Sequence, residues 1–395
     1  MRVLVGARDL SVRSPSGVGT YATEVLRRMF PLAPSDRFTL LTTGMHAPDL
    51  THALSSERRG VACYLPLGKG EHEGVVHVHR RVPNKLLNAS VILTGRPTID
   101  RLARGTFDRL FLPNLDIVSV PRSLPHVLTI HDLSWRLFPE WYSWKMRAWH
   151  AACRPERLIG NAATVLVPSN ATADDLSACF PGVAGRIKVI PHGVADAFSP
   201  HSDPSDHGWR SKLGVPGRFL LFVGTLEPRK NVVALVDAVA AYRKRAGDDI
   251  ALVLAGRWGW NAGALRRRLS RPDAQGWVRL LGYVPTQARP ALYRAAEALV
   301  WPSHYEGFGL PVLEAMASGT PVITSLSSGV AETAGDAAIL VDPLLTDDLT
   351  DAIGQLLGSS ALRARLRDAG LRRTSGFGWE QAARLTLEAI HGGKV

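Results

Sequence analysis

Phosphate-binding and hydroxyl-binding residue types occur together in the segment from residue 304 to residue 323. Its pattern predicts a loop, a short helix from Pro311 to Ser318 and then a strand, because proline suits the first turn of a helix and a glycine follows the last turn. Gly307 and Gly309 leave uncrowded backbone amides just before this helix. Unsatisfied amides and the positive end of the helix dipole both favour an anion there, such as a diphosphate.

Two carboxylates flank this predicted anion site, Glu306 in the loop and Glu314 one turn into the helix. Neither is needed for capping, and neither charge is expected to face a bound phosphate. Carboxylates at these positions are suited to accept hydrogen bonds from sugar hydroxyls. The alternative is a solvated loop with an ordinary surface glutamate, but the combined spacing favours a binding site.

The stretch EGFGLPVLEAMASGTPVI, in which seven residues separate Glu306 from Glu314, resembles the Glu-x7-Glu motif of the retaining family 4 glycosyltransferases of GT-B fold. The resemblance extends through most of the chain. VGTLEPRKN, at residues 223–231, resembles the segment that closes the first strand of the family's donor domain, where a lysine meets the donor diphosphate. It implies that role for Lys230, with Arg229 as a second cation, since fixed cations stabilise a departing nucleoside diphosphate.

The resemblance also implies further donor contacts. Glu314 takes the ribose hydroxyls, and Glu306 takes hydroxyls of the transferred sugar. Tyr283 and Val284 lie in the segment LGYVP, which resembles the place where the family's backbone contacts the nucleotide base. The remaining donor-binding residues are Thr225 and, around the start of the short helix, Gly307, Phe308, Gly309, Leu310 and Val312.

In the first half of the chain, Gly17 and Gly19 follow a predicted strand and open a helix. A dinucleotide-binding fingerprint needs a third glycine at position 22, which is alanine, so NAD binding is an alternative interpretation. In the resembled family, glycines at this place let the backbone approach the donor diphosphate and the acceptor.

His131, in the sequence TIHDLS, follows a predicted strand, and α/β proteins bind ligands at the carboxyl ends of their strands. HDLS and the later PEWYS resemble bacterial mannosyltransferase-like members of the family. The resemblance implies that His131 lines the reaction centre, so His131 and Glu306 are the predicted catalytic residues. No carboxylate stands out as a nucleophile, and for such retaining enzymes the departing phosphate oxygen is proposed to accept the acceptor's proton itself.

His72, His77 and His79 lie near one another around a short strand, but no carboxylate or cysteine accompanies them at ligand spacing. Metal binding is therefore not expected. The resemblance implies no metal either. No cofactor is expected, because the nucleotide-sugar is a co-substrate.

Length and composition indicate two globular domains. The chain has 395 residues, more than one ordinary core, with 46% hydrophobic and 21% charged residues. The longest apolar runs fall far short of a membrane span and the first residues do not resemble a signal peptide, so we expect a cytoplasmic protein. Three scattered cysteines, Cys63, Cys153 and Cys179, indicate neither a disulfide framework nor a zinc site.

Short apolar runs alternate with helical patterns along the chain, which predicts parallel sheets built from βαβ units in both halves. The strands predicted in the first half are Val3–Gly6, Phe38–Leu41, Val61–Leu65, Arg109–Leu112, Val127–Ile130, Val165–Val167 and Ile187–Ile190. Those predicted in the second half are Phe219–Val223, Ala251–Leu254, Val278–Leu280, Ala298–Val300, Val322–Ile323 and Ile339–Val341.

Residues 191–217 are rich in turn formers and are interpreted as the interdomain connection. From Trp379 to Ile390, apolar residues recur at helical spacing and predict an amphipathic helix. Together with the resemblance, this gives a GT-B expectation: two Rossmann-like domains whose parallel sheets face each other across a cleft. Residues 1–195 form the acceptor-side domain, 196–378 the donor-binding domain and 379–395 a helix that returns to the first domain.

The net charge of +12 is concentrated before residue 196, where 24 Lys and Arg stand against 15 Asp and Glu. No nucleic-acid-binding motif accompanies it, so nucleic acid is not an expected partner. The excess indicates a solvated basic face or one that meets anionic lipid. Trp135, Trp141, Trp144 and Trp149 favour peripheral contact with the inner face of an anionic membrane, and packing of these tryptophans is the alternative.

The sequence thus predicts a metal-independent, retaining hexosyltransferase of polysaccharide biosynthesis in the cell envelope. Its expected donor is GDP-mannose, and its acceptor a glycan or lipid-linked saccharide. The alternatives are another nucleotide-sugar donor such as a UDP-sugar, an NAD-dependent oxidoreductase, and a sugar-nucleotide-binding protein without transfer activity. The joint presence of His131, Lys230 and Glu306 argues against the last, because a binder needs no histidine in the first domain.

Overall fold

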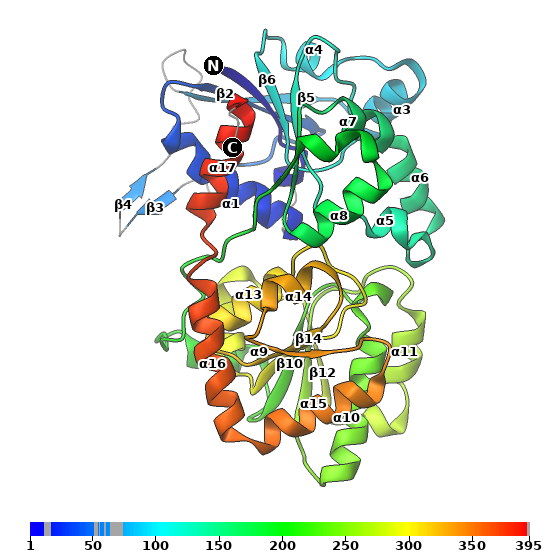
Figure 1. The fold of residues 1–395 in the computed structure, drawn as a ribbon, viewed down its shortest axis with the longest axis vertical. Helices are drawn as coiled ribbons and strands as arrows, with labels where there is room; N and C mark the ends of the chain where they lie inside the picture. Colours follow the sequence, from blue (N-terminus) through cyan, green and yellow to red (C-terminus); the bar gives the residue numbers. More distant parts are fainter. Residues whose placement is uncertain (12–16, 51–53, 55, 59–60, 64–73, 393–395) are drawn as a thin grey trace. The chain divides into compact units, whose positions relative to one another are not determined.

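The computed structural model describes residues 1–11, 17–50, 54, 56–58, 61–63 and 74–392, and the chain divides into two compact units (Figure 1). The first unit comprises residues 1–133, 145–193 and those from 379 onward, and the second comprises residues 134–144 and 194–378. Each contains a parallel sheet flanked by helices, the fold class predicted from the alternating pattern.

The first unit is built on a seven-stranded sheet in the order β5-β2-β1-β6-β7-β8-β9, with every neighbouring pair parallel. Side chains of the central strands, such as Leu4, Leu110 and Leu128, are fully buried, as expected for strands covered on both faces. The strands are β1 (Arg2–Gly6), β2 (Arg37–Gly44), β5 (Val75–Arg81), β6 (Arg109–Leu112), β7 (His126–Thr129), β8 (Thr164–Val167) and β9 (Ile187–Val189).

At one edge of this sheet the structure differs from the sequence prediction. A strand was expected at Val61–Leu65, but its described part, β4 (Val61–Cys63), pairs antiparallel with β3 (Ser56–Arg58) in a separate two-stranded sheet. The edge beside β2 is occupied by β5, all of whose residues pair with β2. The sequence of β5, VVHVHRR, mixes valine with polar residues, and such a strand suits an edge better than a fully buried position.

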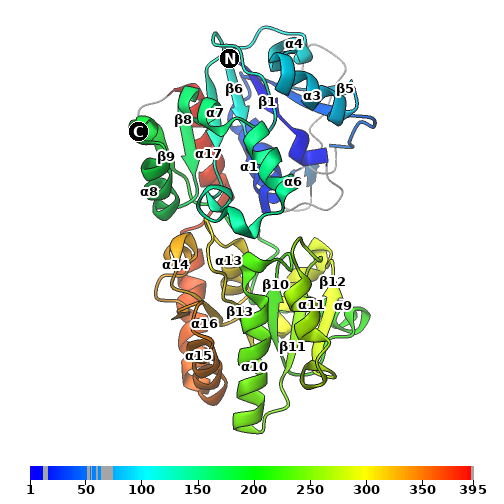
Figure 2. The same cartoon turned by 90° about the vertical axis from the view of Figure 1, so that its right-hand side faces the viewer.

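The C-terminal helix α17 (Trp379–His391) packs beside α1 (Gly17–Leu32) in the first unit (Figures 1 and 2). Asp36 Oδ2 accepts a hydrogen bond from His391 Nε2 at 2.6 Å. The ring of Trp379 stacks on His192, with 5.7 Å between centroids. Further helices among the described residues of this unit are α3 (Asn84–Thr94), α4 (Ile99–Ala103), α6 (Trp144–Ala152), α7 (Pro155–Asn161) and α8 (Asn170–Cys179).

The second unit is built on a six-stranded parallel sheet in the order β12-β11-β10-β13-β14-β15. The chain fills one half of the sheet outward from β10 and then returns to fill the other half from β13. The strand order therefore reverses between these two neighbours. The strands are β10 (Phe219–Val223), β11 (Ala251–Ala255), β12 (Val278–Gly282), β13 (Ala298–Trp301), β14 (Val322–Ser325) and β15 (Ile339–Val341).

Residues 191–217, predicted as the interdomain connection, include the boundary between the two units after residue 193. They contain α9 (Asp206–Leu213), which packs against α12 (Arg289–Ala295), where Arg294 Nε donates to Asp206 Oδ2 at 2.8 Å. The second unit's other helices are α5 (Ser134–Leu137), α10 (Val232–Ala246), α11 (Gly263–Leu269), α13 (Leu310–Ala317), α14 (Ser328–Ala334), α15 (Thr346–Gly358) and α16 (Ser360–Thr374).

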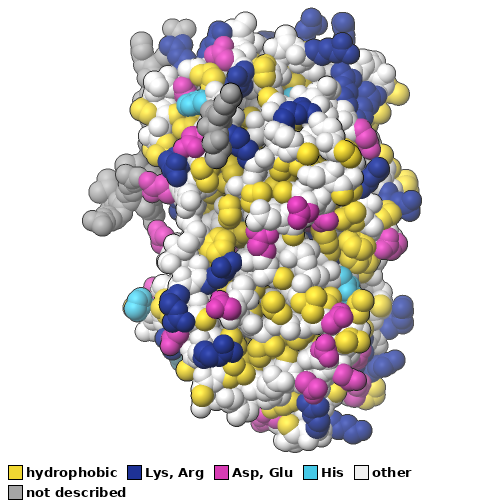
Figure 3. All heavy atoms as spheres, in the orientation of Figure 1, with side chains coloured by type: hydrophobic (Ala, Val, Ile, Leu, Met, Phe, Trp, Pro, Cys, Tyr) yellow, Lys and Arg dark blue, Asp and Glu magenta, His cyan; other side chains and the backbone are white. Residues whose placement is uncertain are grey.

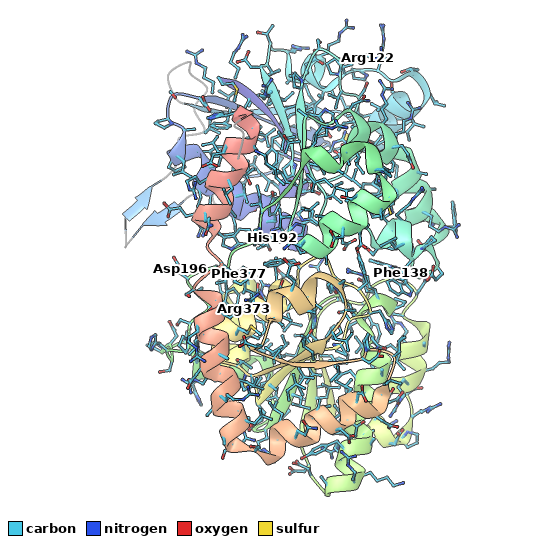
Figure 4. The ribbon with its side chains drawn as sticks, in the orientation of Figure 1. Arg122, Phe138, His192, Asp196, Arg373 and Phe377 are labelled. Atoms are coloured by element: carbon cyan, nitrogen blue, oxygen red, sulfur yellow. The ribbon has the colours of Figure 1, made fainter. Side chains whose placement is uncertain are left out.

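Residues 134–144 pack with the second unit, although the sequence placed them in the first domain. Phe138, which Figure 4 labels, stacks on Trp141 at 4.2 Å between ring centroids, and Trp141 stacks on His304 at 5.8 Å. Trp260 Nε1 donates to the Trp141 carbonyl oxygen at 2.8 Å. These contacts between residues far apart in sequence explain why residues 134–144 belong to the second unit, and they give Trp141 a packing role.

Lys and Arg side chains are spread over the face of the first unit that Figure 3 shows. Trp144 is 73% exposed and Trp149 is 38% exposed. Among the described residues, no helix combines the length and the apolar character that crossing a bilayer requires.

Gly256 follows β11, where an added Cβ would lie 1.7 Å from the Gly224 carbonyl oxygen. We expect Gly256→Ala to destabilise the protein by about 1–3 kcal/mol, because overpacking displaces backbone. Thermal unfolding measures this. Gly208→Ala, in α9, meets no atom within 4 Å and should unfold at an equal or higher temperature, since alanine favours a helix. Equal unfolding temperatures for Gly256→Ala and the wild type would contradict the close approach.

Candidate active site

Several of the predicted donor-binding residues follow the carboxyl ends of β10 and β13, the two strands between which the order reverses. Open α/β sheets bind ligands at such switch points. Arg229 and Lys230 belong to a short 3-10 helix after β10, and Glu306 lies in the loop between β13 and α13. The fold therefore brings together residues that are separated by more than seventy positions in the sequence.

Glu306 forms ion pairs with both cations. Its Oε2 accepts from Arg229 Nη1 at 3.0 Å, and its Oε1 accepts from Lys230 Nζ. Arg229 also reaches the buried carboxylate of Glu227, with 3.1 Å between Nη2 and Oε1. Lys230 is 8% exposed and Glu306 is 6% exposed, so these charges are almost removed from water and depend on one another for compensation.

Two positive and two negative charges thus balance within this cluster. Burial lowers the pKa of Lys230 and the Arg229 guanidinium adds to the effect, while the Glu306 and Glu227 carboxylates oppose it. Burial raises the pKa of Glu227. A group of strongly coupled, desolvated charges at the carboxyl end of a sheet is typical of a functional site.

Trp301, at the end of β13, supports the cluster. Its Nε1 donates to the Val223 carbonyl oxygen at 2.9 Å, and the Lys230 ammonium lies over its ring, 4.4 Å from the centroid. The electron-rich face of an indole stabilises a desolvated cation. Sequence analysis ended this strand at Val300 and assigned Trp301 no role. The feature of the sequence that could have indicated this role is a tryptophan at the carboxyl end of a buried strand.

The start of α13 has the geometry of the predicted anion site. Gly309 is left-handed (φ 100°), and an added Cβ would lie 2.8 Å from Val330 Cγ2. Among the described residues, the backbone amides of Gly309 and Leu310 have no hydrogen-bond acceptor, whereas the Val312 amide donates to the Gly309 carbonyl at 3.0 Å. Gly307 and Phe308 are buried in the preceding loop.

Glu314 is held by partners that the sequence analysis did not identify. Its Oε1 accepts from Arg289 Nη1 at 3.1 Å, and its Oε2 accepts from the Tyr293 hydroxyl at 2.8 Å. Burial raises the pKa of Glu314, although Arg289 and Tyr293 oppose the shift. Arg289 opens α12, and no motif in the sequence marks it, because its role depends on the packing of α12 against α13.

Tyr283, Val284 and Thr225 lie at the same carboxyl edge of the sheet. Tyr283 is 41% exposed and its ring carries the Arg257 guanidinium at 4.6 Å from the centroid. Val284, the next residue in the sequence, is buried, and Thr225, which follows β10, is exposed. The edge thus offers an exposed aromatic ring and a cation near the predicted base-binding segment.

In the first unit, His131 follows β7 and is half-buried. Its ring lies edge-on to Tyr21 at 4.8 Å between centroids and 5.6 Å from the ring of His192, which Figure 4 labels. Nε2 is 2.9 Å from the Pro113 carbonyl oxygen and therefore carries the proton. Burial lowers the pKa of His131, so its imidazole is neutral near pH 7. Sequence analysis did not identify His192.

Gly17 and Gly19 form the first turn of α1, with Gly17 exposed and Gly19 buried. On β5, His77 and His79 both contact the Thr42 hydroxyl, at 2.7 and 3.0 Å. His72 lies outside the described residues. In the part of the chain that the structure describes, no group of three or more His, Cys, Asp or Glu side chains is arranged to hold a metal ion.

Comparisons with known proteins show the family and the fold of the chain. Residues 43–198 match the family model for glycosyltransferase family 4, and residues 208–373 match the model for glycosyl transferases group 1. The O-antigen chain mannosyltransferase B of Escherichia coli is 32% identical over 272 residues, which cover 67% of this chain and 71% of that protein.

Several solved structures match nearly the whole chain, and two of them illustrate the fold. Sucrose-phosphate synthase from Thermosynechococcus elongatus has a TM-score of 0.72 and 21% identity, covering 99% of this chain and 98% of that one. Anabaena HepE in complex with UDP-glucose has a TM-score of 0.71 and 19% identity, covering 99% of this chain and 100% of that one. The expectations of family and fold are confirmed: this chain is a glycosyltransferase that belongs to family 4 and has the GT-B fold.

Proposed function

We propose that this glycosyltransferase moves mannose from GDP-mannose to a hydroxyl of a glycan or lipid-linked saccharide, with retention of anomeric configuration. The observation that carries the proposal is the buried cluster of Lys230, Arg229 and Glu306 next to the start of α13. Its cations and the amides of Gly309 and Leu310 suit a diphosphate. Family membership leaves an NAD-dependent oxidoreductase without support.

In this proposal the donor diphosphate competes with Glu306 for the two cations. Lys230 and Arg229 bind phosphate oxygens and stabilise the charge that develops as the diphosphate departs. Glu306 then accepts hydrogen bonds from the transferred sugar, and Glu314 accepts them from the ribose. The acceptor oxygen bonds to the anomeric carbon as the bond to the phosphate oxygen breaks, and the departing phosphate oxygen takes the acceptor's proton. His131 is proposed as a neutral residue of the reaction centre.

Similarity to an O-antigen chain mannosyltransferase and the HDLS and PEWYS sequences support mannose. The match to HepE in complex with UDP-glucose supports a UDP-sugar as the second candidate donor. We also propose that the enzyme acts in the cytoplasm on cell-envelope polysaccharide, with its first unit in peripheral contact with an anionic membrane. The net charge of +9 before residue 196 and exposed Trp149 support that contact.

A thermal-shift panel of GDP-, UDP-, ADP- and TDP-sugars tests the donor. We expect GDP-mannose to raise the unfolding temperature most, since a ligand at a hundred times its Kd stabilises the native state by about 2.7 kcal/mol. The largest shift with UDP-glucose would favour the second candidate. Release of GDP with formation of a mannosylated acceptor distinguishes an enzyme from a protein that only binds the donor.

Lys230→Ala and Glu306→Gln should separate donor binding from transfer. Lys230→Ala is expected to weaken GDP binding at least about tenfold and to lower turnover, because the ammonium meets both bound diphosphate and developing charge. Glu306→Gln should bind GDP as tightly as the wild type or more tightly, because Lys230 loses an ionic competitor, but should transfer poorly. Calorimetry and initial rates measure both effects.

Lys244→Ala is the matched control, since Lys244 is exposed in α10 and outside the cluster. It should leave GDP affinity and turnover unchanged. Unaltered GDP affinity in Lys230→Ala would overturn the assignment of Lys230 to the diphosphate.

Activity should survive EDTA, because the proposal assigns the diphosphate charge to Lys230, Arg229 and the start of α13. The measurement compares initial rates before and after chelation and dialysis. Loss of activity that Mg²⁺ or Mn²⁺ restores would show that the cluster is insufficient without a metal ion.

A further inference from the structure

The first unit contains a cavity of about 340 Å³ that the proposed transfer reaction does not use. Its walls come from the loop between β6 and β7, the end of α3 and the junction of α6 with α7. The volume lies at the lower end of the range that binds small organic molecules. It is therefore large enough for a ligand of about the size of a sugar or an aromatic ring.

Three arginines, Arg122, Arg154 and Arg157, line this cavity, and its lining includes no Asp or Glu. All three side chains are exposed. In the described part of the chain, neither Arg122 nor Arg157 forms an ion pair, and Arg154 Nη2 donates to the Ile92 carbonyl oxygen at 2.6 Å. Three cations that line one cavity repel one another, and an anion bound among them relieves that repulsion.

Arg154 also has an unusual backbone conformation. It is a non-glycine residue in the left-handed region (φ 50°), directly before Pro155 at the start of α7. L-residues adopt this conformation at an energetic cost, and such conformations concentrate at binding sites. Here the hydrogen bond to the Ile92 carbonyl holds the side chain of Arg154 at the cavity.

The inner wall of the cavity is apolar and uncharged. Val91, Leu124 and Leu158 line it, together with Cys153, whose thiol pKa is raised by burial. His126 closes the wall; its Nε2 bonds to the Leu158 carbonyl at 2.8 Å, and burial lowers its pKa although this hydrogen bond opposes the shift. A cationic rim over an apolar floor matches a phosphate ester of a compact organic group.

The cavity is remote from His131. His126 opens β7 and lines the cavity, whereas His131 follows the other end of the same strand. Figure 4 shows Arg122 and His192 at opposite ends of the first unit, and His192 packs beside His131. The length of strand β7 thus separates the cavity from the proposed reaction centre.

We propose that this cavity is an accessory binding site for a phosphate ester, with the phosphate held by Arg122, Arg154 and Arg157 and the organic group on the apolar floor. The phosphate can belong to a small soluble molecule or to a lipid headgroup. Both sources present the same chemistry, a phosphate oxyanion next to a less polar group.

Phenyl phosphate is a suitable soluble probe. Calorimetry with the full chain should show that it binds more tightly than inorganic phosphate, because only the ester covers the apolar floor. Arg122→Ala/Arg157→Ala should weaken phenyl phosphate binding at least about tenfold. Both positions are exposed, so the variant should remain folded. Arg81→Ala/Arg147→Ala, which removes two exposed arginines elsewhere in the same unit, should bind as the wild type does.

Lys230→Ala should bind phenyl phosphate normally, which separates the cavity from the proposed donor site. The lipid source is tested by co-sedimentation with phosphatidylglycerol vesicles and with pure phosphatidylcholine vesicles. Phenyl phosphate binding that depends on Arg122 and Arg157 supports a soluble ligand. Vesicle binding alone with the same dependence supports a headgroup. The proposal would be overturned if the protein bound neither phenyl phosphate nor vesicles. It would also be overturned if the Arg81→Ala/Arg147→Ala control lost as much binding as Arg122→Ala/Arg157→Ala.

Discussion

The ammonium group of Lys230 is almost fully removed from water, and the second unit is arranged to compensate it. An unpaired buried ammonium is strongly unfavourable, so the fold surrounds it with the Glu306 carboxylate and the face of Trp301. Glu306 in turn is shared with Arg229, which a second buried carboxylate, Glu227, helps to hold. Each charge is tolerable only because the others are present, which fixes the positions of two loops against one sheet.

The loop after β10, which carries both cations of the cluster, passes close to the residues that follow β11. Gly256 allows this, because its missing side chain leaves room for the Gly224 carbonyl. On the other side of β10 in the sheet lies β13, which ends in Trp301. The indole of Trp301 donates to the carbonyl of Val223 in β10. Backbone contact on one side and an indole bridge on the other thus position the residues that follow β10.

Local patterns predicted most strands and the short helix at α13, since apolar runs bounded by turn residues report burial directly. The spacing of Glu306 and Glu314 and the family resemblance around Lys230 singled out three residues that the fold places at the carboxyl end of the second sheet. They could not identify Arg289, because its importance arises only when α12 packs against α13. The strand expected at Val61–Leu65 and the placement of residues 134–144 went wrong for the same reason: pairing partners are chosen by tertiary contacts.

The balance of charge in the cluster constrains how the proposed site can work. Before the donor binds, Glu306 already occupies the two cations that suit the diphosphate. In the proposed function, binding of the diphosphate would weaken the hold of Lys230 and Arg229 on Glu306 and leave the Glu306 oxygens available for sugar hydroxyls. A nucleoside diphosphate without its sugar would free the same oxygens but offer them no hydroxyl donor, leaving a buried carboxylate less well compensated. The ion pairs of the cluster would thus favour the intact nucleotide-sugar over the product nucleotide, and product release would restore the pairing of Glu306.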